Sequence, residues 1–121
     1  MRTWNRTAVL VVPKQPLLDW LQAEDPDSAD MTLPDLERDP SIYLLPEVDS
    51  DDEAAHFLAG YCGDIFEEQL AGWLTEPECW PKDRGFDNFK RWFQYSFHSM
   101  VIDLSDEPLV SIDMSVPFDL R

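Results

Sequence analysis

Apolar residues near the start of the chain fall in two short runs. Residues 8–12, AVLVV, form a continuous apolar run rich in β-branched side chains, and a proline ends it. Such a run predicts a strand buried on both faces. Residues 41–48, SIYLLPEV, form a second apolar run of strand length. We expect two buried strands joined through a short helix over residues 16–23, because Pro16 suits a first helical position.

The middle of the chain carries the signal of a long helix. The acidic segment before it reads as a solvated connection, with one helical turn at residues 33–37 capped by Thr32. Ser50 and Glu53 then have the spacing of a capping box. From Ala55 onward apolar side chains recur every three or four positions, which predicts an amphipathic helix of about 25 residues.

The aromatic stretch near residue 90 fits two periods. Large apolar side chains between residues 86 and 104 recur at helical spacing, and this period accounts for more positions than any other, so it predicts a second long helix. The competing interpretation is a strand, because Phe93, Tyr95 and Phe97 alternate with polar residues.

These elements predict a small mixed fold. Residues 109–114, LVSIDM, alternate apolar and polar side chains and predict an edge strand. The fold class is therefore α/β or α+β, with a small three-stranded sheet covered by two long amphipathic helices and one short helix. We expect one globular domain over residues 1–114 and a flexible tail over residues 115–121.

Charge restricts the possible partners. The 121 residues carry a formal net charge of -16, and residues 15–80 hold 18 acids against Arg38 alone. Such a surface repels phosphate, so we expect no direct binding of nucleic acid and no attraction to anionic membranes. Basic proteins are the natural partners. Solubility alone is the plainer explanation of the charge.

The cysteines and the chain start indicate the compartment. Cys62 and Cys79 lie 17 positions apart, without CxxC spacing or a framework of pairs, which is typical of reduced thiols. The start of the sequence lacks the features of a secretory signal, and no apolar run is long enough to span a membrane. We expect a cytoplasmic protein.

Four segments carry a resemblance to a family. At VVPKQPLLDWL, YLLPE, FEEQLAGW and WPKDRGFDNFKRWFQYSFHSMVIDLSDEPL, the chain resembles a family of small acidic uncharacterised bacterial proteins of similar length. The likeness covers nearly all of residues 8–110. It implies a bacterial, cytoplasmic, single-domain protein, and it supplies no catalytic residue, because none is assigned in that family.

Candidate chemistry is sparse. Asp64, Glu67 and Glu68 share a helical face and are suited to weak binding of a hard cation, although a solvated acidic face explains them as well. A small enzyme would use Cys79 as nucleophile, with Lys82 and Arg84 nearby to lower the thiol pKa, or His98 as base. His98 is more often a hydrogen-bonded structural residue. No cofactor motif, metal-ligand spacing or phosphate-cradling glycine loop is present, so we expect neither cofactor nor metal.

Protein binding is the favoured function. We expect a non-enzymatic acidic module, an adaptor or an inhibitor, that binds a protein partner. The expected contact residues belong to the loop after the long helix and to the acidic helix face: Trp80, Lys82, Asp83, Arg84, Glu67 and Glu68. The competing explanation for Trp80 is that its ring covers the core. A rival within the binding class is DNA mimicry, in which carboxylates imitate phosphates. Oligomeric state stays open.

Overall fold

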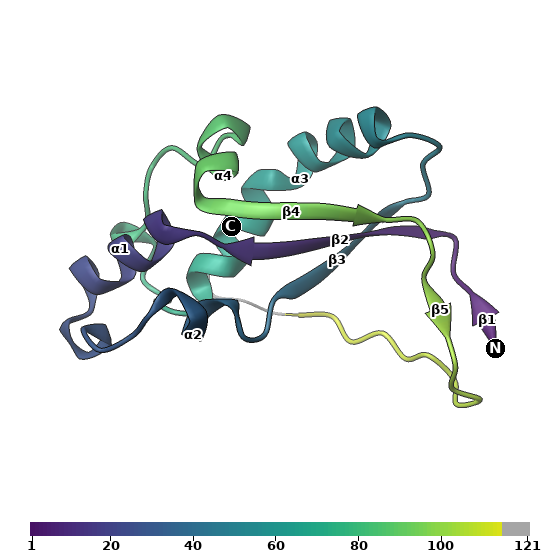
Figure 1. The fold of residues 1–121 in the computed structure, drawn as a ribbon, viewed down its shortest axis with the longest axis horizontal. Helices are drawn as coiled ribbons and strands as arrows, with labels where there is room; N and C mark the ends of the chain where they lie inside the picture. The colour runs from purple at the N-terminus through teal and green to yellow at the C-terminus, as the bar shows by residue number, and fades with distance from the viewer. Residues whose placement is uncertain (115–121) are drawn as a thin grey trace.

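A central strand organises the main sheet. The computed structural model describes residues 1–114 (Figure 1). The main sheet has the order β3-β2-β4, and both pairs are antiparallel. Its strands are β2 (Arg6–Pro13), β3 (Ser41–Pro46) and β4 (Phe93–His98). A separate antiparallel pair is formed by β1 (Arg2–Thr3) and β5 (Ile102–Asp103).

Helices connect these strands. In the described part of the chain the α-helices are α1 (Gln15–Glu24), α2 (Leu33–Glu37), α3 (Asp51–Ala71) and α4 (Phe86–Trp92). Two short 3₁₀ turns are η1 (Pro26–Ser28) and η2 (Pro77–Cys79). The predicted start of the long helix is confirmed, because the Ser50 hydroxyl accepts a hydrogen bond from the Glu53 backbone N–H at 3.2 Å.

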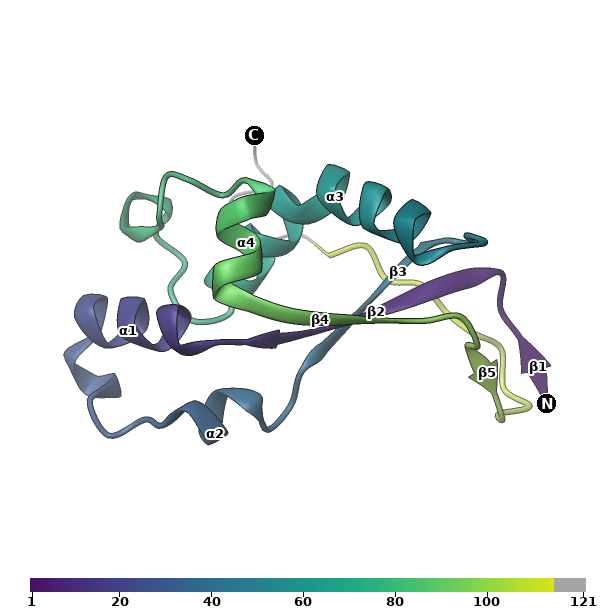
Figure 2. The same cartoon turned by 45° about the horizontal axis from the view of Figure 1, so that its top comes forward.

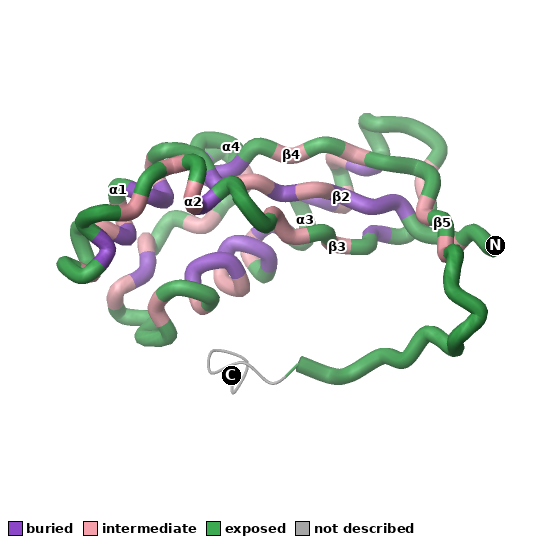
Figure 3. The backbone as a smooth tube through the Cα atoms, turned by 60° about the horizontal axis from the view of Figure 1, so that its bottom comes forward, coloured by how far each residue is buried: buried purple, intermediate pink, exposed green. Residues whose placement is uncertain are grey.

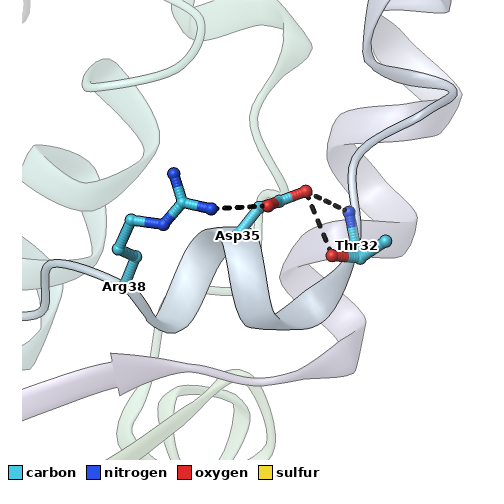
Figure 4. Close-up of polar contacts among 3 residues, drawn as sticks. All are labelled: Thr32, Asp35 and Arg38. Carbon is cyan, nitrogen blue, oxygen red and sulfur yellow. Dashed lines mark hydrogen bonds and ion pairs between the residues drawn. The ribbon is translucent and has the colours of Figure 1, made fainter.

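The short helix α2 begins at a polar cluster that Figure 4 shows. The carboxylate of Asp35 accepts hydrogen bonds from the Thr32 backbone N–H at 2.9 Å and from the Thr32 hydroxyl at 3.0 Å. Arg38 donates to the other carboxylate oxygen at 3.1 Å. The Thr32 backbone bond, followed by the Thr32 hydroxyl bond, lowers the pKa of Asp35 below its ordinary value. The predicted helical turn is confirmed, with the acid reaching back to Thr32, the residue just before the helix.

The core lies between the sheet and two helices. Phe66 of α3 is fully buried, and its ring centroid lies 6.2 Å from that of Phe89, 5.3 Å from that of Trp92 and 5.2 Å from that of Phe93. These rings join α3, α4 and the first residue of β4. Figure 2 shows α3 and α4 on the same side of the strands. Hydrophobic burial therefore covers one face of the sheet, which fixes the inward-facing positions of each strand.

The predicted fold class is confirmed, but two of its elements are wrong. The structure combines helices with a three-stranded sheet, in the α+β manner. The second long helix, expected over residues 86–104, ends at Trp92, and the competing strand follows it as β4. Residues 109–114 form no strand, so β4 and not this segment supplies the third strand. The expected tail over residues 115–121 lies outside the described residues.

Candidate protein-binding surface

Trp80 lies in the core. The residue is 6% exposed, and its indole Nε1 donates a hydrogen bond to the Leu74 carbonyl at 2.8 Å. The ring is part of the same cluster of buried residues as the α3 and α4 side chains. Trp80 therefore holds the loop after α3 against the domain and offers little surface to a partner.

The rest of this loop is held by polar bonds. Arg84 donates to the Pro81 carbonyl at 2.8 Å and forms an ion pair with Glu67 at 3.2 Å. The Asp83 carboxylate accepts from the Gly85 backbone N–H at 3.1 Å, which turns the chain into α4. Lys82 is exposed. The loop thus presents Lys82 and Asp83 to solvent from a fixed backbone, while Arg84 is half-buried.

The two candidate acids of α3 point to different partners. Glu67 faces Arg84, as the ion pair shows, whereas Glu68 accepts a hydrogen bond from the Tyr43 hydroxyl of β3. Gln69 donates to the same hydroxyl at 2.8 Å. Burial first, and then the bond to Glu68, raise the pKa of Tyr43 well above its ordinary value. No local pattern predicts this cluster, because Tyr43 is 25 positions from Glu68 along the chain.

A shallow cavity adjoins the Tyr43 partners. It measures about 190 Å³ and lies between α2, the start of β3 and the end of α3. Its lining includes Leu36, Ser41, Glu68, Gln69 and Trp73. The volume is below that of typical small-molecule pockets, which run from ~300 Å³ upward. This cavity therefore gives no support to a cofactor or drug-sized ligand.

The structure shows the surroundings of the two candidate catalytic residues, Cys79 and His98. Partial burial, followed by the charges of the nearby acids Glu24, Glu76 and Glu78, raises the pKa of Cys79. This result corrects the expectation that Lys82 and Arg84 would lower it. His98 is exposed and shares a 2.8 Å hydrogen bond with the Ser96 hydroxyl.

The thiols and acids also show no converging ligand set. Cys62 and Cys79 are free cysteines. Within residues 1–114, no group of three or more His, Cys, Asp or Glu side chains is placed to hold a metal ion. Asp64 and Glu67 make interactions of their own, and Glu68 is bonded to Tyr43. The acidic face of α3 is therefore engaged within the domain.

Among residues 1–114, the outer face of β3 is left uncovered at two large aliphatic side chains. Tyr43 bonds to α3, so the side chains on the opposite side of β3, Ile42 and Leu44, face away from the helices. Ile42 is 64% exposed and Leu44 is 54% exposed. Their cross-strand partners on β2, Leu10 and Ala8, extend the same apolar face. The expectation that the β3 run is a buried strand is therefore wrong for these two residues.

Figure 3 shows the distribution of burial along the backbone. Buried residues gather in β2 and along α3, whereas the backbone of β3 is mostly exposed or half-buried. The outermost strand of an antiparallel sheet commonly has one solvated face, but that face is usually polar. Two large aliphatic side chains on it are the feature that calls for an explanation.

Unpaired acids flank β3 at both ends. Glu37 and Asp39 precede the strand, and Glu47 and Asp49 follow it; all four are exposed. The three ion pairs between Lys or Arg and a carboxylate within residues 1–114 involve none of these acids. The nearby Arg38 pairs with Asp35 instead. The exposed side chains of Ile42 and Leu44, the apolar strip of β3, therefore lie between two acidic ends.

Comparisons with known proteins leave these observations to stand by themselves. No protein-family model, no curated protein and no solved structure matches the chain. Among residues 1–114, every helix is too short or too polar to cross a lipid bilayer.

Proposed function

We propose that this protein is a non-enzymatic binding module for a basic protein partner, which it contacts through the outer face of the β3-β2-β4 sheet. The observation that carries the proposal is the exposure of Ile42 and Leu44 on the outer face of β3, within residues 1–114. Exposed apolar side chains that adjoin one another are a mark of protein contact surfaces, whereas single exposed ones are ordinary.

Charge indicates the sign of the partner. A net charge of -16 repels other acidic proteins and attracts basic ones, and the acids flanking β3 add this preference locally. In such a surface the apolar strip supplies most of the binding free energy. The charged rim orients the partner and raises the rate of association. The combination suits a partner with an apolar contact segment bordered by Lys or Arg.

The loop after α3 is a second candidate surface for the same function. Lys82 and Asp83 are its exposed members, and the ion pair between Arg84 and Glu67 fixes its shape. Trp80 supports this loop from within the core. A partner contact here would respond to Lys82→Glu and be indifferent to changes on β3.

The rival functions make different demands. A DNA mimic would use carboxylates alone, would compete with DNA for its partner and would lose binding steeply with salt. The apolar strip of β3 has no use in that mechanism. An enzyme acting through Cys79 needs a thiolate, and the raised pKa of this thiol works against one.

The test compares three immobilised proteins in capture from a cell lysate at low and high salt. They are the wild type, the variant Ile42→Ser/Leu44→Ser, and the matched variant Leu104→Ser/Leu109→Ser, which also replaces two exposed leucines away from the sheet. Far-UV circular dichroism checks that all three fold. We expect one stoichiometric basic partner with the wild type and the matched variant, and its loss with Ile42→Ser/Leu44→Ser.

Each other outcome has a definite meaning. A partner that all three proteins retain would refute the sheet face and direct the search to Lys82. A partner displaced by duplex DNA would favour mimicry. The absence of any partner at both salt concentrations would refute the binding function.

A further inference from the structure

The pairing of β2 fixes the direction of every backbone group in the sheet. The Lys14 N–H donates to the Trp92 carbonyl at 2.8 Å, one step beyond the last pair of β2 and β4, Pro13 with Phe93. In an antiparallel sheet the N–H and C=O of one residue point to the same neighbour, and successive residues alternate. The backbone N–H and C=O groups of even-numbered residues of β2 therefore point towards β4, and those of odd-numbered residues point towards β3.

This alternation determines which groups of β3 are open. Val9 is an odd-numbered residue of β2 that lies opposite Tyr43. The backbone N–H and C=O of Tyr43 therefore bond to β2. The backbone N–H and C=O of Ile42 and Leu44 then point away from the sheet, at its free edge. Pro46 has the same parity, so its missing N–H falls on the free edge, where proline is tolerated.

This edge is unoccupied within residues 1–114. β3 is an outer strand in the order β3-β2-β4, and none of the backbone bonds formed by loops and turns reaches residues 41–46. Two residues therefore present a donor and an acceptor each to solvent, next to the two exposed aliphatic side chains that the same residues carry. Backbone pairing and apolar contact are available together.

We propose that the β3 edge receives an extended segment of the basic partner as a fourth strand, with Lys or Arg at both ends of that segment. The proposal rests on the proposed function and specifies how the partner binds. An added strand gains main-chain hydrogen bonds at the edge and side-chain contacts on one face. Its ends would lie beside Glu37 and Asp39 at one end and Glu47 and Asp49 at the other, about 20 Å apart for six extended residues.

Charge complementarity selects this occupant over two others. A second copy of the chain would bring another net charge of -16 to the same contact, and mutual repulsion opposes that pairing. The segment 109–114 of the same chain forms no helix or strand, but it carries Asp113 and follows Asp106 and Glu107. It would place carboxylates against the acids that flank β3.

Amide hydrogen exchange tests the geometry directly. The probes are the peptide Lys-Lys-Thr-Val-Thr-Val-Thr-Lys-Lys and the same peptide with Glu in place of each Lys, each added to ¹⁵N-labelled full-length protein. We expect the Ile42 and Leu44 amides to exchange rapidly in the free protein and at least tenfold more slowly with the lysine peptide. The Tyr43 amide, which pairs with β2, is the internal control and stays protected throughout.

Two pairs of variants test the two components of binding. Leu44→Pro removes an outward N–H without touching the β2 pairing, and we expect it to lower the affinity for the lysine peptide at least tenfold. Leu44→Val keeps the N–H, so its affinity for the peptide should stay within about twofold of the wild type. Glu47→Gln/Asp49→Asn removes two flanking charges and is expected to weaken binding about fivefold at low salt. The matched Glu76→Gln/Glu78→Gln removes two charges elsewhere and leaves binding unchanged.

The outcomes separate this inference from the proposed function. Slow exchange of the Ile42 and Leu44 amides before any peptide is added would mean that a second copy or the chain's own segment fills the edge. Sedimentation would distinguish the two by the oligomeric state. Either result overturns the proposal. Equal binding of both peptides overturns it, because the flanking acids would then select nothing. Binding of neither also overturns it and is the result expected if the flanking acids protect the edge against pairing. A captured partner that leaves the two amides unprotected would keep the binding function and refute strand addition.

Discussion

Replacing Trp80 with alanine separates a core role from a contact role. If the ring is part of the core, its removal destabilises the domain; if it is a contact, its removal weakens binding and leaves the fold intact. The residue is 6% exposed and its indole N–H is bonded to the Leu74 carbonyl. We therefore expect a large loss of stability.

The magnitude follows from the buried area. A buried tryptophan removes about 150–250 Å² from water, which at about 25 cal/mol per Å² amounts to ~4–6 kcal/mol. Measured substitutions of large aromatic residues by alanine cost about 3–5 kcal/mol. Since small domains are stable by only about 5–15 kcal/mol, Trp80→Ala should lower Tm by roughly 10–20 °C.

The assay is urea unfolding followed by far-UV circular dichroism, which does not depend on the fluorescence of the residue removed. The matched control is Trp73→Ala, because Trp73 is 39% exposed and should cost no more than about 1–2 kcal/mol. A loss below about 1 kcal/mol for Trp80→Ala, together with loss of the captured partner, would refute the core assignment.

Three further predictions concern titrating groups. The raised pKa of Tyr43 contributes its full stabilisation below the ordinary tyrosine pKa near 10, and this contribution is lost as pH rises towards the folded pKa. Urea unfolding between about pH 9 and 11.5 should therefore show a fall in the free energy of unfolding that Tyr43→Phe lacks. In a Cys62→Ser background, Cys79 should react with iodoacetamide more slowly than free cysteine at pH ~8.5, because its pKa is raised. The lowered pKa of Asp35 stabilises the fold above the ordinary aspartate pKa, and this contribution is lost as pH falls through the folded pKa. NMR titration of the Asp35 carboxyl should show a midpoint below the ordinary one, and Thr32→Ala should raise that midpoint in part.

Each titration has a result that would contradict it. Identical pH dependence of wild type and Tyr43→Phe would mean that the hydroxyl ionises normally in the fold. Alkylation of Cys79 as fast as free cysteine would restore the thiol as a candidate nucleophile. An ordinary midpoint for Asp35 would mean that the bonds from Thr32 do not persist in solution.

The sequence predicted the elements whose signals are local. The caps and the apolar period of α3 lie within one stretch of chain, so the helix and its start at Ser50 could be located from the residues alone. The central strand was recognisable because residues 8–12 form a continuous apolar run of strand length, although the expected burial on both faces is incomplete, since Leu10 and Val12 on the outer face are half-buried.

The error after Trp92 arose from a spacing that fits two structures. Phe89, Phe93 and Phe97 are four positions apart, and a step of four returns a side chain to one face of a helix and also to one face of a strand. What decides between them is the pairing of β4 with β2, which joins residues 80 to 90 positions apart. No local pattern contains that pairing.

The position of Ile42 and Leu44 could not be predicted for a related reason. An apolar run indicates that side chains avoid water, but it does not state which strand lies at an edge. That depends on the sheet order, which places β3 outside β2. The surface that we propose for binding is therefore a consequence of topology.

The order of the strands along the chain has a consequence for synthesis. The central strand is made first, but one of its neighbours is β4, and the pair of Ala8 with His98 joins opposite ends of the domain. Until the ribosome has released residues 93–98, β2 lacks one partner and Phe66 lacks the ring of Phe93. We therefore expect the nascent chain to complete its fold only after nearly all of the described residues have emerged, and to depend until then on whatever shields the bare side of β2.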